Sequence, residues 1–287
     1  MTIPVGTLAP GDQWDQTLLD DLFSNRLYPT GLQFRRCAGY PHSDIDGAII
    51  ICPGRYWHHR TNEISEALAR YKWVLFIKTG DEEDLLDAPY RIVHNNIRFW
   101  IQTPRADRDY GDARLFGVGF PAHFDDLPAH APDKTRELFL SAQGTHTRRH
   151  MAFSVLSGRD GITETAGFTQ GLDPREYARE MLSARVAPAP SGACSPDSFR
   201  LYEALEAHTV PIADDVSPVY HSVNYWRNLF EDPPFPIYED VADLPAFIDE
   251  ILADWPRKAN QVTAWWLRYK RRMAHWLLED LTTLGAI

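Results

Sequence analysis

The stretch that decides the fold is RVAPAPSGACSPDSFRLYEALEAHTVPIA, residues 185–213. It begins with a short apolar segment at 185–189, passes through a loop rich in Pro, Ser and Gly, and continues with helical spacing. A second apolar segment closes it at 209–213. A strand, a helix and a strand in this order form a βαβ unit, whose strands run parallel. This stretch therefore predicts an α/β fold.

The same alternation extends along most of the chain. In the first half, the predicted strands are 47–52, 73–77, 97–101 and 114–120, with a helix at 62–71. In the second half, the predicted strands include 137–141 and 161–166, with helices from about Thr147 and at 173–184. A polar, Pro-containing segment at 125–136 separates the halves. Two such βαβ series joined by a linker predict a protein of two lobes with a cleft between them. The last 30 residues carry aromatic residues at helical spacing and are predicted to form one or two long helices.

The composition of the chain argues against several classes of function. The formal net charge of −11 argues against nonspecific electrostatic binding to DNA or to anionic lipid. The three cysteines form no C-x-x-C pair, so a disulfide framework or a structural zinc site is not expected. The N-terminus lacks the pattern of a signal peptide and the apolar runs are too short to span a bilayer, so the expected location is the cytoplasm.

The loop and helix of the opening stretch have two explanations. Ser195 followed by Pro196 fits an N-cap with proline at the first helical position, so the helix could satisfy its own N-terminus. Alternatively, free amides after a Gly-containing loop could bind a diphosphate. In the same way, Glu203 could bind a ribose diol, or simply pair with Arg200 on the surface. The residues alone leave both pairs of alternatives open.

The segment 190–215 resembles the donor-binding segment of exostosin-like glycosyltransferases, glycosyltransferase family 47. The matching features are a loop, an Arg-containing helix, an EAL-x-A turn and a TVPI strand, in that order. The preceding segment KTRELFLSAQGTHTRRHMAF (134–153) and the later DDVSPVYHSVNYW (214–226) resemble the family's flanking segments. The resemblance covers about residues 134–260, and the N-terminal half has no matching motif.

The resemblance implies a GT-B fold of two Rossmann-like lobes. The acceptor-side lobe would be 1–130, the nucleotide-sugar lobe 131–260, and 261–287 would be C-terminal helices that pack back on the N-terminal lobe. Glu203 would bind the ribose, and Arg200 would be a nearby cation. The residues implied around the diphosphate are Ser141, Gln143, Gly144, Arg148, Arg149, Ser191, Gly192, Ser195 and Ser198.

Two features depart from the family. His208 stands where the family closes the helix with Gly; we expect it to end the helix with positive φ, which His tolerates better than a β-branched residue. The animal and plant members are also membrane-anchored, whereas no anchor is predicted here. A bacterial or viral cytoplasmic relative fits this difference.

The sequence motifs that could bind a metal ion lack the context that such sites require. Two D-x-D sequences, at 44–46 and 107–109, do not follow an apolar strand as the metal–diphosphate motif of GT-A enzymes does. His146 and His150 are four residues apart but lack a third ligand at zinc-enzyme spacing. No metal site and no cofactor are therefore predicted.

The general base is expected in the first half of the chain. The segment CPGRYWHHR (52–60) follows a buried strand, at the edge of a parallel sheet where ligands bind. His58 and His59 suit proton abstraction near neutral pH, and Asp81 after the strand at 73–77 is a further candidate. All three could equally be loop residues or, for Asp81, part of a helix start.

The sequence thus predicts a metal-independent transferase that moves a sugar from a UDP-sugar to an acceptor hydroxyl. The acceptor could be a glycan, a small molecule, a protein or a modified nucleic-acid base. The alternative is a non-catalytic Rossmann-like module that binds a nucleotide or a partner.

Overall fold

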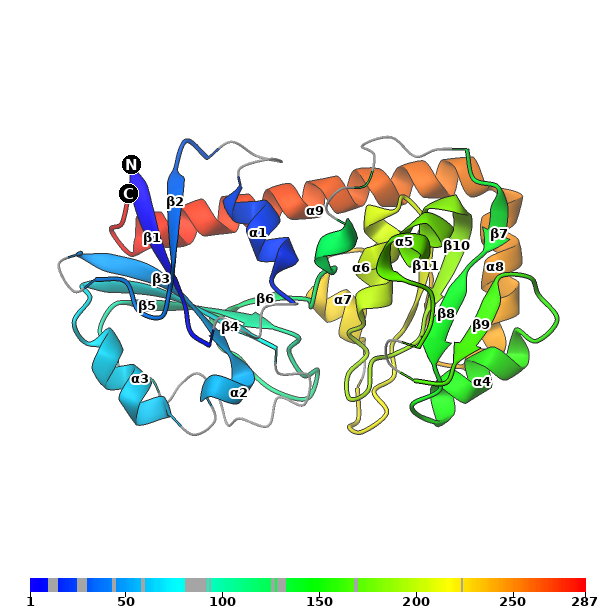
Figure 1. Cartoon of the computed structure of the whole chain (residues 1–287), viewed down its shortest axis with the longest axis horizontal. Helices are drawn as coiled ribbons and strands as arrows, with labels where there is room; N and C mark the ends of the chain where they lie inside the picture. Colours follow the sequence, from blue (N-terminus) through cyan, green and yellow to red (C-terminus); the bar gives the residue numbers. More distant parts are fainter. Residues whose placement is uncertain are drawn as a thin grey trace. The chain divides into compact units, whose positions relative to one another are not determined.

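Figure 1 shows the computed structural model of the chain. It describes residues 1–9, 15–24, 30–42, 45–57, 60–80, 92, 94–124, 127, 133–167, 170–222 and 224–287. The chain divides into two compact units. Unit 1 comprises Met1–Pro104, Arg108–Val118 and Arg268–Ile287, and unit 2 comprises Arg105–Asp107 and Gly119–Leu267. The boundary predicted at residue 130 therefore falls inside unit 2.

Unit 1 is built on a six-stranded parallel sheet with the order β2-β1-β3-β4-β5-β6. Its strands are β1 (Thr2–Thr7), β2 (Gln33–Ala38), β3 (Gly47–Pro53), β4 (Trp73–Thr79), β5 (Ile97–Gln102) and β6 (Arg114–Phe116). Its short helices are α1 (Thr17–Phe23), α2 (Gly54–Trp57) and α3 (Thr61–Leu68). The strand order changes direction between β1 and β3, which is the topological switch of a doubly wound sheet.

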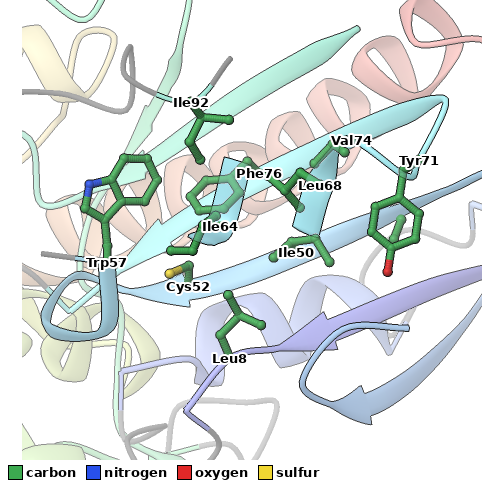
Figure 2. Packing of buried hydrophobic residues seen from close by; sticks show 11 residues of the cluster. Leu8, Ile50, Cys52, Trp57, Ile64, Leu68, Tyr71, Val74, Phe76 and Ile92 are labelled. Atoms are coloured by element: carbon green, nitrogen blue, oxygen red, sulfur yellow. The ribbon is translucent and has the colours of Figure 1, made fainter. Parts of the chain in front are cut away.

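The central strands β3 and β4 are buried along their whole length, because helices cover both faces of the sheet. Figure 2 shows one of these faces, where Ile50 and Phe76 pack against Ile64 and Leu68 of α3. Trp57 of α2 meets the ring of Phe76 edge to face, with 5.0 Å between centroids. The long apolar runs in the sequence therefore form the core of unit 1.

The other face of this sheet is covered by α1 and the last part of α9 (Figure 1). Helix α9 (Trp255–Thr283) is a single helix, and its residues from Arg268 onward belong to unit 1. Trp100 of β5 donates a hydrogen bond from its indole nitrogen to Asp280, at 2.7 Å. Lys270 forms a buried ion pair with Asp21 of α1, at 3.3 Å. The C-terminal segment is thus part of the core of unit 1.

Unit 2 contains a four-stranded parallel sheet with the order β12-β11-β10-β7, and a separate parallel pair, β8-β9. Its strands are β7 (Arg136–Leu138), β8 (Leu140–Gln143), β9 (Ile162–Thr165), β10 (Ala184–Ala189), β11 (Val210–Asp214) and β12 (Ile237–Tyr238). Its helices are η2 (Ala122–Phe124), α4 (Thr147–Val155), α5 (Pro174–Ser183), α6 (Phe199–Glu206), α7 (Tyr225–Leu229), η3 (Val241–Asp243), α8 (Leu244–Ala253) and the first part of α9. Helix α6 packs on β10 and β11 beside α5, and α8 contacts the same two strands.

The strand predicted at 137–141 is interrupted. Residues up to Leu138 pair with β10, whereas Leu140 onward pairs with β9. Phe139 lies at the junction, where its N–H still donates to the carbonyl of Val186 on β10. A continuous apolar run gives no sign of such a change of partner, because all three residues from Leu138 to Leu140 are buried. The strand predicted at 114–120 is also shorter and ends at Phe116.

Lys134 is buried in unit 2, and below about pH 7 its amino group is a cation. Its ammonium group donates to the carbonyls of Leu182 and Ala207, at 2.7 Å each, and to the hydroxyl of Thr209, at 3.0 Å. The two carbonyls lie at the C-terminal ends of α5 and α6, where the helix dipole favours a positive charge. Lys134 therefore ties these two helices to the start of β7.

Burial lowers the pKa of Lys134 to about 7, from 10.5. Between these values the unfolded chain binds the proton that the folded chain has lost, so this group makes the free energy of unfolding rise with pH. Relative to Lys134→Met, we expect the wild type to gain up to about 1.4 kcal/mol per pH unit between pH 7 and 9. Urea unfolding at several pH values checks this, with Lys72→Met as an exposed control. A difference that does not change with pH would contradict it.

Among the described residues, no helix combines the length and the apolar character needed to cross a membrane.

Candidate functional site

Polar residues gather where three parallel strands of unit 2 end. Strands β8, β10 and β11 end at Gln143, Ala189 and Asp214, and each is followed by a loop with polar side chains. The carboxyl ends of parallel strands are where α/β proteins bind their ligands. Most of the residues predicted at the donor site lie at this edge, in the cluster described below.

Asp214 is the centre of this cluster. Its side chain is fully buried and accepts hydrogen bonds from Arg148 Nε at 3.0 Å and from Arg148 Nη2 at 2.6 Å. It also accepts from the backbone N–H and the hydroxyl of Ser191, at 3.4 and 3.3 Å, and from the N–H of Val216, at 3.1 Å. One carboxylate therefore joins the loops after β10 and β11 to helix α4.

Arg148 and Arg149 donate hydrogen bonds to different kinds of acceptor. Arg148 is held by Asp214 and by the carbonyl of Glu239, at 2.9 Å. Arg149 is buried, and it donates to the carbonyls of Ser191 and Gln143, at 2.9 and 3.2 Å. These two bonds fix the Arg149 guanidinium at the strand ends.

His146 lies beside Arg149 as the first residue before α4. Its Nε2 is 3.3 Å from the carbonyl of Ser191, which makes Nε2 the protonated nitrogen, because a carbonyl can only accept. Its Nδ1 is buried and has no hydrogen-bond partner in the residues that the structure describes. Burial lowers the pKa of His146, so the ring is neutral at neutral pH and presents a lone pair on Nδ1.

The loop between β10 and α6 does not have the predicted helix start. Helix α6 begins at Phe199 with Ser198 as its N-cap, rather than with Ser195 and Pro196. The hydroxyl of Ser195 instead accepts from the N–H of Asp197 at 3.2 Å and so forms a tight turn before the helix. Gly192 packs under this turn, where an added Cβ would lie 2.5 Å from the carbonyl of Asp197. A glycine is therefore required there.

Two helices start at this edge without a side-chain cap. The N-cap residues are His146 for α4 and Ser198 for α6, and neither side chain accepts a hydrogen bond from its helix. By contrast, Asp173 caps α5 through the amides of Arg175 and Glu176. The positive ends of both helix dipoles therefore lie at this edge, where they favour an anion.

Glu203 lies on α6, almost fully buried, 2.8 Å from the hydroxyl of Tyr177 on α5. Burial raises the pKa of Glu203, while Arg200 and the Tyr177 hydrogen bond lower it. Arg200 also donates to the carbonyl of Ser141 on β8, at 3.3 Å. Tyr177 bonds to Oε2 of the carboxylate, and no other described side chain hydrogen-bonds to Glu203. This leaves Oε1 for another donor.

Gly144 follows β8 and lies against a pair of polar side chains, since an added Cβ would clash with Glu164 and His150. His150 and Glu164 are 3.1 Å apart and mostly exposed. His208 ends α6 with φ of +53°, which confirms the left-handed conformation expected at this position.

The predicted general bases His58, His59 and Asp81 lie outside the described residues, so they stay predictions. Of the two D-x-D segments, Asp46 is exposed and pairs with Lys72 at 2.7 Å, and Asp107 pairs with Arg105. Within the described ranges, no group of three or more His, Cys, Asp or Glu side chains is arranged to hold a metal ion.

Sequence reasoning missed Asp214, Tyr177 and the orientation of His146. Asp214 carried a usable signal, because an acid directly after the buried strand TVPIA must lie at the ligand-binding edge of a parallel sheet. Tyr177 carried none, since its position opposite Glu203 depends on how α5 packs on α6. Comparison of the chain with models of known protein families and with curated proteins finds no match, so the family resemblance remains a prediction.

Proposed function

We propose that this protein is a glycosyltransferase that moves a sugar from a UDP-sugar to an acceptor hydroxyl. The observation that carries the proposal is the edge of unit 2, where Arg149, two uncapped helix N-termini and the Ser191–Ser198 loop come together. A diphosphate is stabilised by fixed cations and by the positive ends of helix dipoles, and both kinds of group lie at this edge.

In the proposed reaction, the bond between the sugar and the diphosphate breaks while the acceptor oxygen bonds to the sugar. Negative charge grows on the departing UDP, and stabilising it is the main catalytic task. We assign this task to Arg149 and to the amides at the starts of α4 and α6. Arg148 is already bonded to Asp214, so we assign it to holding the loops in place. Under this proposal the reaction needs no metal ion.

We further propose that the two units form the lobes of a GT-B enzyme of the exostosin-like type, in the cytoplasm. Two parallel α/β units in one chain support this arrangement. The acceptor would bind on the side of unit 1, and His58, His59 or Asp81 would supply a base if the reaction inverts the anomeric centre. A glycan, a small molecule, a protein or a modified base could serve as acceptor.

The first test is binding. We expect UDP and UDP-sugars to raise the melting temperature of the protein, and UDP to be released when the protein is incubated with its correct UDP-sugar. No shift with any nucleoside diphosphate and no release from a panel of UDP-sugars would contradict the proposal. It would favour the non-catalytic partner-binding module instead.

The variant Glu203→Gln tests whether Glu203 binds the ribose of UDP. The proposal places a ribose hydroxyl on Oε1 of Glu203, with Tyr177 holding the other oxygen. A hydrogen bond to a charged acceptor contributes roughly 1.5–3 kcal/mol, so we expect UDP binding to weaken about 10- to 100-fold. Isothermal titration calorimetry with UDP and 2′-deoxy-UDP checks this.

The wild type should prefer UDP over 2′-deoxy-UDP, and the variant should lose that preference. Glu176→Gln, at an exposed acid of α5, is the matched control and should bind UDP like the wild type. A Glu203→Gln variant that still discriminates between the two nucleotides would show that the ribose lies elsewhere.

A further inference from the structure

Unit 1 holds a second polar cluster, at the carboxyl ends of β4 and β5. Gln102, the last residue of β5, is fully buried and makes three hydrogen bonds. Its Nε2 donates to the carbonyls of Asp15 and Val118, at 2.9 and 3.2 Å, and its Oε1 accepts from the N–H of Gly80, at 2.9 Å. This one amide therefore fastens the segment before α1 to the ends of two strands.

Two residues beside this hydrogen-bonded amide, Gln16 and Thr79, have buried polar side-chain atoms that make no hydrogen bond to any described residue. Gln16 follows Asp15 and is 1% exposed, yet both Oε1 and Nε2 of its side chain are buried without a hydrogen-bond partner among the described residues. Thr79 precedes Gly80 and is fully buried, and within the described part of the chain its Oγ1 also has no hydrogen-bond partner. Buried polar groups in native proteins are nearly always paired. The contrast with Gln102, an equally buried amide with all its partners, sets Gln16 and Thr79 apart.

Backbone geometry at this edge is also unusual. Thr103, directly after Gln102, has φ of +51°. A β-branched residue rarely adopts this left-handed conformation, and such strain concentrates at ligand-binding positions. Gly80 has φ of +63°, and an added Cβ would lie 2.7 Å from Oδ2 of Asp15, so the backbone there is closely packed against a carboxylate. Strain and unpaired polar atoms thus occur within the same few residues.

We propose that Gln16 and Thr79 are part of a binding site in unit 1 for a hydroxyl group of a neutral, sugar-like ligand. The amide of Gln16 and the hydroxyl of Thr79 each present a donor and an acceptor. A hydroxyl group also combines both, so it can satisfy either partner. An anion would leave the acceptor atoms unpaired, and a cation would leave the donor atoms unpaired.

This site belongs to unit 1 and does not depend on nucleotide chemistry. If sugar transfer is established, the ligand bound here is the acceptor. Because Gln16 and Thr79 are almost fully buried, a ligand could reach them only after a local opening of this edge. We therefore expect its association to be slower than a purely diffusional encounter.

Two near-isosteric variants, Thr79→Val and Gln16→Met, test the site through two opposite effects. Without ligand, each removes buried polar atoms that have no partner, so we expect the melting temperature to rise by about 2–4 °C. Gln102→Met is the matched contrast: it removes an amide that is fully bonded, and we expect its melting temperature to fall.

Ligand binding is measured in the absence of nucleotide, by saturation-transfer NMR with methyl glycosides of glucose, galactose, mannose and xylose. We expect at least one glycoside to bind the wild type and to lose about 10-fold or more in affinity in each variant. A lower melting temperature for Thr79→Val would overturn the proposal, because it would mean that a sealed water already satisfies the hydroxyl. Equal glycoside binding by wild type and variants, or no binding at all, would overturn it as well. None of these outcomes bears on UDP binding by unit 2, which the thermal-shift test measures separately.

Discussion

Arg149→Met is expected to slow the release of UDP from the preferred UDP-sugar by about 100- to 1,000-fold, which is the range found when one preorganised charge-stabilising donor is removed. Arg149 is buried, and two neutral carbonyls fix its guanidinium at the strand ends. A fixed charge needs no reorganisation when the leaving diphosphate forms, so its loss should reduce kcat more than it raises KM. Steady-state kinetics on the UDP-sugar identified by thermal shift measures both parameters.

Two controls separate loss of charge from loss of structure. Arg149→Lys keeps the charge but loses the planar group that spans Ser191 and Gln143, so we expect an intermediate rate. Arg179→Met, at an exposed position of α5, should behave like the wild type. An Arg149→Met protein that folds normally and retains its rate would remove Arg149 from the proposed chemistry.

The contrast between predicted and missed strands has a physical cause. Strands β3 and β4 were predicted because burial on both faces requires continuous apolar runs. Strand β2, QFRRCA, was missed because it lies at the edge of the sheet and five of its six residues are exposed, which leaves no apolar pattern. Strand β1 combines Pro and Gly with only a few apolar residues, and it forms because β2 and β3 pair with it.

At the candidate site, too, the contacts that depend on tertiary packing could not be predicted from the sequence. The family resemblance led us to expect Arg148, Arg149, Ser191 and Gly192 around one site, and all four lie near the strand ends of unit 2. The sequence did not reveal that Arg148 is bonded to Asp214, 66 residues away, because that pairing depends on the order of strands in the sheet. The start of α6 was misplaced for a local reason: a Ser-Pro pair suits a helix start, but Ser195 forms a turn with Asp197 instead.

Asp214→Ala is expected to destabilise unit 2 by about 3–5 kcal/mol, because it leaves the largely buried Arg148 without its counter-charge. The change also removes the acceptor for Ser191 and Val216, so the loops after β10 and β11 lose their common anchor. Urea unfolding followed by circular dichroism measures the effect. Because the chain has two units, we expect it to appear as an earlier transition for unit 2 alone, with that of unit 1 unchanged.

A double-mutant cycle shows whether the ion pair itself is responsible. If the unpaired charge causes most of the loss, the double variant Asp214→Ala/Arg148→Met should recover a large part of the stability that Asp214→Ala alone loses. Additive losses would instead place the cost in the bonds to the two loops, since Ser191 and Val216 stay unpaired in both variants. Asp214→Asn separates the effect of the charge from that of the loop bonds. Its amide oxygen can still accept a hydrogen bond from Ser191 or Val216, while the negative charge is gone. A wild-type-like stability for Asp214→Ala would contradict the view that this carboxylate organises the edge on which the proposed diphosphate site is built.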